Sequence, residues 1–315
     1  MNWGLTVPLP GVKLGAHKEL VQELPALGYT DVWSAETNGD DGFTPLALAS
    51  QWAPELRLGP AIVPVYTRGP ALLAQQAATL ADLAPGRFVL GIGTSSDTIV
   101  ERWNGIPFTE PFAKVRDTLR FLRRALAGEK VTDEALGVKG FRLEAAPEVP
   151  PRIALAALRP GMLRLAAREA DAAITNWLSP QDVRTVREAF HPDKELLARL
   201  FVVPTEDADE ARKLGRWLIT SYLNVPVYQK FHEWLGRGEA LRPMNEAWAS
   251  GDRQGALKAI PDEVVDDLIV HGSPAECRER IREYVAGGLT TPILMLLPNS
   301  QINGVEAVRA LAPTA

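Results

Sequence analysis

The chain has 315 residues, of which 46% are hydrophobic and 23% charged, and its formal net charge is −5. This composition predicts a globular fold and argues against nucleic acid as a partner. The single cysteine, Cys277, excludes internal disulfide bonds and metal sites built from several thiolates. Because no apolar run reaches membrane-spanning length and no signal-peptide pattern is present, we expect a cytoplasmic protein without a membrane partner.

Short apolar runs alternate with helical patterns along the whole chain. Most of these runs lack polar alternation, which indicates strands buried on both faces of a parallel sheet. The eight predicted strands are residues 5–9, 31–35, 58–65, 88–92, 153–157, 172–176, 199–203 and 292–297. Eight strand–helix units close most simply into a (β/α)8 TIM barrel, an α/β fold. A doubly wound sheet would place its glycine loop after the first strand rather than the fourth.

Proline marks the predicted start of five helices, where the first turn has no hydrogen bond to lose. These prolines are Pro45, Pro70, Pro160, Pro180 and Pro274. Ser179 and Ser273 each precede an acidic residue by three positions, and only the second pair, with Glu276, is predicted to form a full capping box. Cys277 falls inside that last helix and is predicted to be a packed thiol rather than a nucleophile.

Two stretches interrupt the alternation of strands and helices within what we expect to be one domain over residues 1–315. Residues 128–151 are rich in charge, glycine and proline, and 141–143 are predicted to form a small surface strand. Residues 224–269 carry Trp234 and Trp248 and are predicted to form a lid or an oligomer contact.

Residues 86–96 (GRFVLGIGTSS) combine a buried strand with a loop of small and hydroxyl side chains. Glycine lets a flat ligand approach the backbone, and the hydroxyls of Thr94 and Ser95 offer uncharged donors beside Gly93. The pattern therefore predicts one wall of a pocket. A tight strand-to-helix turn is the alternative, since glycine and serine favour that as well.

The residues that follow the predicted strands exclude several classes of barrel enzyme, since function lies at this end of the fold. The four histidines lack metal-binding spacing, and no strand ends in a lysine suited to a Schiff base. Paired carboxylates and a G-x-S-x-G motif are also missing. The residues that follow the predicted strands thus offer glycine, hydroxyl and amide groups and one acid, Glu36. Such a set suits an organic cofactor and no metal.

Four motifs together resemble the bacterial luciferase-like superfamily, in the branch that uses coenzyme F-420 and is akin to methylenetetrahydromethanopterin reductase. They are residues 63–75 (VPVYTRGPALLAQ), 86–96, 103–108 (WNGIPF) and 162–166 (MLRLA) with 170–171. The resemblance implies a luciferase-like TIM barrel with insertions that passes a hydride between the deazaflavin and a small organic substrate. It also implies a homodimer.

The resemblance implies a role for particular residues. A non-prolyl cis peptide that supports the cofactor ring is expected within Pro60, Ala61 and Ile62, with an ordinary cis bond at Gly59–Pro60 as the alternative. Gly93, Thr94 and Ser95 would face the ring. The cofactor phosphate would lie against Ala156, Ala157, Arg159, Pro160, Gly161 and Met162, where a helix begins.

Three further expectations concern the substrate side of the site. Asn176 would hydrogen-bond the cofactor, whereas Trp177 is as well explained by packing. Glu36 is the candidate for proton transfer, with a solvated strand-end glutamate as the alternative. A glutamate that some relatives carry after the fourth strand is replaced here by serine or threonine. Trp103, Asn104 and Phe108 would wall the substrate, or pack under their loop.

Two other functions stay open. An FMN-dependent monooxygenase of the same fold would place phosphate and ring in similar positions. A barrel that binds a cofactor or a partner without turnover is the second alternative, because Glu36 is the single acid at the site.

Overall fold

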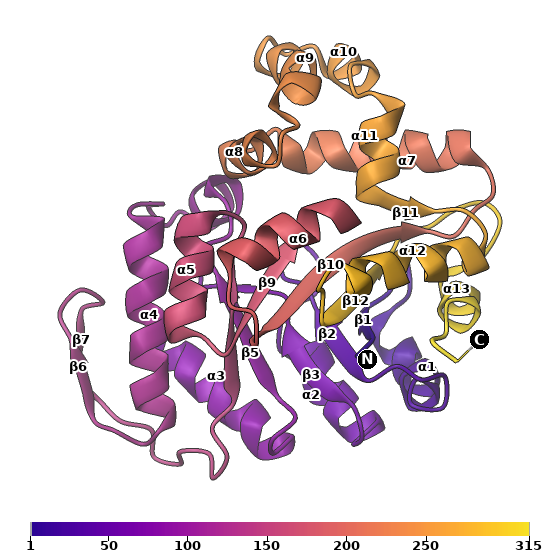
Figure 1. Ribbon diagram of the computed structural model, residues 1–315. Coiled ribbons are helices and arrows are strands. Elements are labelled where there is room, and N and C mark those ends of the chain that lie inside the picture. The colour runs from indigo at the N-terminus through magenta and orange to yellow at the C-terminus, as the bar shows by residue number, and fades with distance from the viewer. Residues whose placement is uncertain (1, 315) are drawn as a thin grey trace.

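A ring of parallel strands forms the centre of the computed structural model, which describes residues 2–314 (Figure 1). Its segments are β1 (Gly4–Thr6), β2 (Asp31–Ser34), β3 (Arg57–Pro60), β4 (Val63–Pro64), β5 (Val89–Gly93), β8 (Arg152–Ala156), β9 (Ala172–Asn176), β10 (Glu195–Val203) and β12 (Thr291–Leu296). They are hydrogen-bonded in the order β3-β2-β1-β12-β10-β9-β8-β5-β4. Because β3 and β4 are successive parts of the third strand, and β4 pairs with β5, the ring closes. The predicted (β/α)8 barrel is confirmed.

The third barrel strand is interrupted where one continuous strand over 58–65 was predicted. Its two segments are separated at the peptide bond between Ala61 and Ile62, which is cis. The predicted non-prolyl cis peptide is therefore present, and the alternative at Gly59–Pro60 is wrong. The only other cis bond among residues 2–314 joins Val7 to Pro8, just past the end of β1.

Helices surround the barrel, and the five that proline predicted begin at or next to Pro45, Pro70, Pro160, Pro180 and Pro274. They are α1 (Lys18–Glu23), α2 (Thr44–Trp52), α3 (Pro70–Leu83), α4 (Pro111–Leu126), α5 (Pro160–Glu169), α6 (Pro180–Ala189), α12 (Pro274–Ala286) and α13 (Gly304–Ala310), with short turns η1 (Leu14–His17) and η2 (Thr98–Trp103). Ser273 forms its predicted capping box. The prediction that Ser179 lacks one is wrong, because the shorter Asp182 side chain still accepts from the Ser179 N–H at 2.7 Å.

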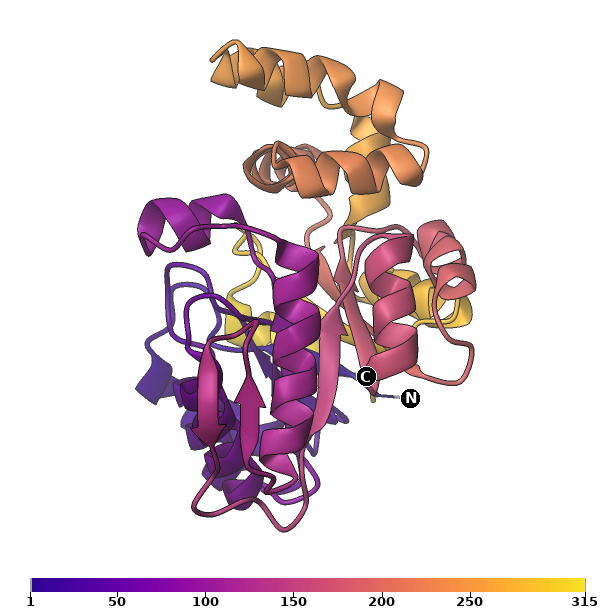
Figure 2. The same ribbon diagram turned by 90° about the vertical axis from the view of Figure 1, so that its left-hand side faces the viewer.

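The first interruption forms a small hairpin on the outside of the barrel. Strands β6 (Val131–Asp133) and β7 (Val138–Phe141) pair antiparallel and lie beside α4 (Figures 1 and 2). The predicted strand at 141–143 is displaced toward the N-terminus. Gly137 turns the chain with a φ of 68°, so β7 starts directly after it and ends at Phe141.

The second interruption covers the carboxyl ends of the barrel strands. Helix α7 (Ala208–Leu223) is followed by α8 (Pro226–Trp234), α9 (Gly238–Ala249), α10 (Arg253–Lys258) and α11 (Asp262–Leu268). These five helices, residues 208–268, form a helical cap above the barrel (Figures 1 and 2). Strand β11 (Ile269–His271), which was not predicted, then pairs with β10. These helices lie where a lid would lie, while the lid function and the oligomer contact both stay predictions.

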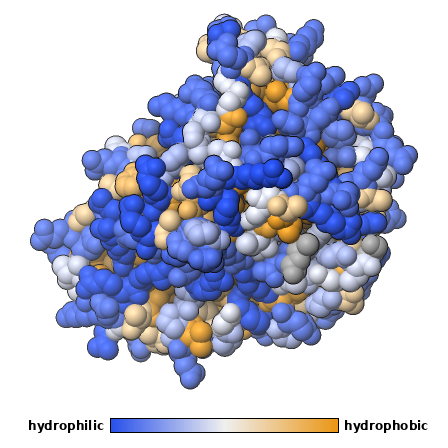
Figure 3. Space-filling view, in the orientation of Figure 1, coloured by the Kyte–Doolittle hydropathy of each residue, from blue (hydrophilic) through white to orange (hydrophobic). Residues whose placement is uncertain are grey.

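Apolar side chains fill the barrel and the space under its helices. Trp33, Ile174, Leu197 and Ile293 form the inner cluster, and Cys277 packs outside it on α12. Cys277 is fully buried, so the predicted packed thiol is confirmed, and burial raises its pKa to about 12. The face seen in Figure 3 is mostly hydrophilic, with small separate apolar patches. No helix within residues 2–314 is both long and apolar enough to cross a bilayer.

His232 of α8 makes the stability of the helical cap sensitive to acid. Its ring is fully buried, and neither ring nitrogen has a hydrogen-bond partner among the described residues. Burial, together with the charge of Arg237, lowers the pKa of His232 to about 3. The unfolded chain binds a proton here below about pH 6.5 while the folded chain does not, so this residue costs stability as the pH falls.

Replacing His232 by leucine is therefore expected to weaken the loss of stability in acid. The free energy of unfolding of His232→Leu, measured relative to the wild-type protein, should be about 2 kcal/mol higher at pH 5 than at pH 8. Each pH unit below about 6.5 costs the wild-type protein about 1.4 kcal/mol, and the variant does not bear this cost. Urea unfolding of both proteins at the two pH values measures this. Equal losses of stability in both proteins would contradict the assignment.

Candidate active site

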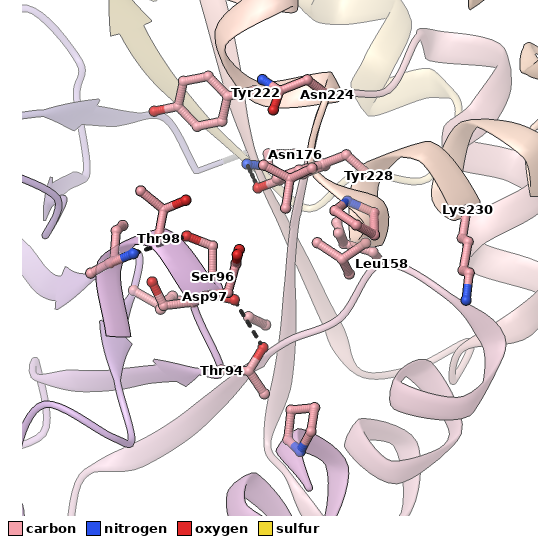
Figure 4. Close-up of a pocket in the computed structure, with 18 of the residues that line it drawn as sticks. Thr94, Ser96, Asp97, Thr98, Leu158, Asn176, Tyr222, Asn224, Tyr228 and Lys230 are labelled. Carbon is pink, nitrogen blue, oxygen red and sulfur yellow. Dashed lines mark hydrogen bonds between the residues drawn. The ribbon is translucent and has the colours of Figure 1, made fainter. Parts of the chain in front are cut away.

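A cavity of about 1630 Å³ lies between the carboxyl ends of the barrel strands and the helical cap (Figure 4). Its walls come from the loops after β2, β5, β8 and β9 and from helices α7, α8 and α9. Ligand pockets commonly measure about 300 to 1,000 Å³. The cavity therefore has room for a large cofactor together with a substrate.

Most of the residues that the sequence predicted for the site meet in this cavity. Those that line it are Glu36, Ala61, Ile62, Thr94, Ser95, Ala156, Arg159, Pro160, Gly161, Met162 and Asn176. Pro60, Gly93 and Ala157 lie behind this lining. Trp103 lines the cavity as well, whereas Asn104 bonds the Ile99 carbonyl and Phe108 packs on Tyr66. Trp177 is buried against Phe201, in agreement with the packing alternative.

The end of β5 presents a smooth backbone surface. A Cβ added to Gly93 would lie 2.7 Å from Cβ of Ala156, so only glycine lets the two strand ends pack this closely. Ser95 then adopts a positive φ of 61°, which turns the chain into the loop. Thr94 and Ser95 line the cavity beside the Ala61–Ile62 segment, giving uncharged donors beside a flat wall.

Gly91 holds β3 and β5 in contact just below this wall. A Cβ at this position would lie 1.9 Å from the Pro60 carbonyl oxygen, which is a backbone atom and cannot turn aside. Gly91→Ala is therefore expected to lower the free energy of unfolding by about 1 to 3 kcal/mol. Gly15→Ala is the control, since nothing lies within 4 Å of its added Cβ. Urea unfolding measures the stability of the two variants. Equal free energies of unfolding would show that β3 can move away from the added methyl group without a loss of stability.

The first turn of α5 offers a site for an anion. Its N-cap, Arg159, makes no side-chain capping bond, and Pro160 occupies the first turn. The N–H groups of Gly161 and Met162 lack intrahelical acceptors, and the helix dipole makes this end positive. Arg159 is exposed and has no carboxylate partner in the described part of the chain. A phosphate would find backbone donors and a cation here.

Glu36, on the loop after β2, accepts hydrogen bonds from two residues, Gly42 of the same loop and Arg68 between β4 and α3. One Nη of Arg68 donates to Oε2 of Glu36 at 2.6 Å, and the other donates to Oε1. The Gly42 N–H also donates to Oε2, at 2.7 Å. Both side chains are mostly buried. Arg68 belongs to the motif at 63–75, but its pairing with Glu36 was not predicted.

Three polar residues that line the cavity, Arg199, Tyr222 and Tyr228, were not predicted from the sequence. Arg199 extends from β10 and donates to the Ala61 carbonyl, while its Nε has no partner among residues 2–314. Asn176 donates to the Tyr228 hydroxyl at 3.2 Å (Figure 4). Burial raises the pKa of Tyr228, so this phenol stays protonated. Arg199 could have been noticed in the sequence as a charged residue in an otherwise apolar strand. No sequence pattern pointed to Tyr222 or Tyr228.

Within the described range 2–314, no three histidine, cysteine, aspartate or glutamate side chains come together as metal ligands. The flat backbone wall, the uncharged donors and the positive end of α5 instead fit a planar organic cofactor that carries a phosphate.

Comparison with known proteins finds relatives that align along most of the chain. The 5,10-methylenetetrahydromethanopterin reductase of Archaeoglobus fulgidus is 27% identical over 308 residues, which cover 92% of each protein. The F420-dependent glucose-6-phosphate dehydrogenase of Kineococcus radiotolerans is 35% identical over 274 residues, covering 79% of this chain and 76% of that protein. The structure of the coenzyme F420-dependent tetrahydromethanopterin reductase of Methanopyrus kandleri matches with a TM-score of 0.74 at 20% identity, covering 99% of this chain and 97% of that one.

A family model confirms the resemblance seen in the sequence motifs. The model is described as luciferase-like monooxygenase and matches residues 5–291, which is most of the chain. This chain therefore belongs to the luciferase-like monooxygenase family of oxidoreductase enzymes.

Proposed function

We propose that this protein is an F-420-dependent oxidoreductase that transfers a hydride between the deazaflavin and a small organic substrate. The observation that carries the proposal is one cavity with a flat wall at Ala61–Ile62 and a positive helix end at Arg159. Relatives named for F420 support the choice of cofactor. A cytoplasmic location and a homodimer, both expected from the sequence, stay predictions.

The chain would hold the cofactor at several points. Ala61 and Ile62 would support the ring, with Gly93, Thr94 and Ser95 beside it. The turn from Arg159 to Met162 would take the phosphate, and Asn176 would hydrogen-bond the cofactor. The bound deazaflavin supplies the hydride chemistry. The protein would fix the relative orientation of the cofactor and the substrate, and the helical cap would exclude water from them.

Separate titrations of the purified protein with F-420 and FMN test this function. We expect F-420 to bind at least tenfold more tightly than FMN, as measured by fluorescence. Tighter binding of FMN would favour the FMN-dependent monooxygenase instead. Binding of neither cofactor would favour a barrel that binds a partner without turnover.

Removing the cation at the α5 N-terminus is expected to weaken binding of F-420. Arg159→Met should raise the Kd about fivefold to tenfold, because a charge-assisted contact at an exposed site is worth about 1 kcal/mol. Arg164→Met is the matched control on the same helix, since Arg164 is exposed but does not line the cavity. Equal Kd values for the two variants would remove Arg159 from the phosphate site.

A further inference from the structure

Three aromatic side chains are exposed around the cavity. Trp103 of η2 is 53% exposed, Phe112 of α4 42% and Trp217 of α7 61%. All three line the same cavity, although they come from segments far apart in the sequence. The other large apolar side chains that are exposed within residues 2–314 are aliphatic and lie outside it, namely Leu72, Leu83 and Val149. We name Trp103, Phe112 and Trp217 the aromatic rim.

The aromatic rim has no ring-to-ring packing among residues 2–314 that would account for its exposed side chains. Other aromatic residues have ring partners, such as Trp177 on Phe201 with centroids 4.2 Å apart. No ring contact involves Trp103, Phe112 or Trp217 in the part of the chain that the structure describes. Exposing large apolar side chains to water is unfavourable, and exposed apolar groups that gather at a concave surface mark binding sites.

Several cations at or near the cavity already have partners. Arg253 lies 3.7 Å from the ring centroid of Trp248 and donates to its carbonyl. Arg102 lies 3.5 Å from Asp97, and Arg68 is paired with Glu36. Arg159 is assigned to the cofactor phosphate. Two further cations line the cavity: Arg199, which donates to the Ala61 carbonyl, and Lys230, which is exposed on α8.

The inner wall adds neutral hydrogen-bonding groups. Asn176, Tyr222, Asn224 and Tyr228 all line the cavity and appear together in Figure 4. An apolar outer part with a few neutral polar groups deeper inside suits a ligand with an apolar ring system and one polar end.

We propose that the substrate is an apolar compound with at least one aromatic or alicyclic ring and that its body stacks on the aromatic rim. This inference rests on the proposed function, because it places the substrate in the part of the cavity that bound F-420 would not fill. It distinguishes this chain from its sugar-phosphate-oxidising relative, because a sugar phosphate has no apolar ring body to stack on the rim.

Calorimetric titration with 2-naphthol and with glucose 6-phosphate tests the inference. 2-Naphthol is a suitable probe because it has no carbinol hydrogen and is not turned over. We expect the F-420-loaded protein to bind 2-naphthol at least tenfold more tightly than glucose 6-phosphate. Trp103→Ala and Trp217→Ala should each weaken the binding of 2-naphthol about threefold to tenfold while leaving the Kd for F-420 within twofold.

The control is Leu72→Ala, which truncates a 49% exposed side chain on α3 outside the cavity and should change neither affinity. Circular dichroism of each variant checks that the fold is intact. Unchanged 2-naphthol binding in both rim variants, or tighter binding of glucose 6-phosphate, would overturn the inference. Failure of the wild-type protein to bind F-420 would refute the proposed function separately.

Discussion

Replacement of Arg57 by methionine is expected to lower the free energy of unfolding by about 3 to 5 kcal/mol, because two buried carboxylates lose their cation. Arg57 lies inside the barrel at the N-terminal ends of the strands. It donates to Asp31, which is fully buried, and one Nη lies 2.7 Å from Oε1 of Glu195. Thr291 accepts a further bond from Arg57 at 3.2 Å.

Neighbouring groups cannot replace this cation. Arg152 reaches Glu195 at 3.0 Å but is half exposed and makes no contact with Asp31. Burial already raises the pKa of Asp31, and the charge of Arg57 opposes that effect. Without Arg57, Asp31 must be buried either unpaired or protonated, and both states cost free energy.

Urea unfolding at pH 7 measures the effect of Arg57→Met. The matched control is Arg309→Met, which breaks an ion pair with Glu23 between half-exposed side chains and should cost no more than about 1 kcal/mol. Adding Asp31→Asn to Arg57→Met should recover part of the loss. Similar costs for the two single variants would show that water reaches the barrel interior and solvates the carboxylates.

The barrel itself could be predicted because its signals are local. Apolar runs without polar alternation located the strands, and proline located the starts of α2, α3, α5, α6 and α12. The break at Ala61–Ile62 could not be read from the strand pattern, since residues 58–65 are apolar on both sides of it. That feature came from the resemblance to a known family.

The cavity could be predicted only in part. The wall formed by β5 and the first turn of α5 follow directly from strand ends, so short motifs were enough. The aromatic rim was not predictable in the same way, because Trp217 reaches the cavity only when the helical cap folds over the barrel. The bond between Asn176 and Tyr228 likewise joins residues 52 positions apart.

Glu36 is the one acid that the sequence placed at the site, and its partners limit what it can do. Two Nη atoms of Arg68 and the N–H of Gly42 donate to its carboxylate. Its carboxylate oxygens thus act as acceptors in all three bonds, which positions Glu36 as an acceptor rather than a donor. If Glu36 transfers protons, it therefore acts as the base when an alcohol is oxidised.

Glu36→Gln is expected to lower kcat about 100-fold on this assignment, because general base catalysis contributes at least that factor. Glutamine has nearly the same shape and still offers an oxygen to Gly42, so the Kd for F-420 should change less than twofold. The measurement is steady-state kinetics with the best substrate from a panel of ring-bearing alcohols and aldehydes.

The comparison with Arg68→Met separates catalysis from loop anchoring. That variant keeps the carboxylate but removes its cation, so kcat should fall less than tenfold if Glu36 itself accepts the proton. If the pair serves only to fix the loop over residues 36–42, the two variants should lose activity equally. Equal losses, or an unchanged kcat in Glu36→Gln, would remove Glu36 from the chemistry and make the neutral phenol of Tyr228, which accepts a bond from Asn176, the next side chain to test.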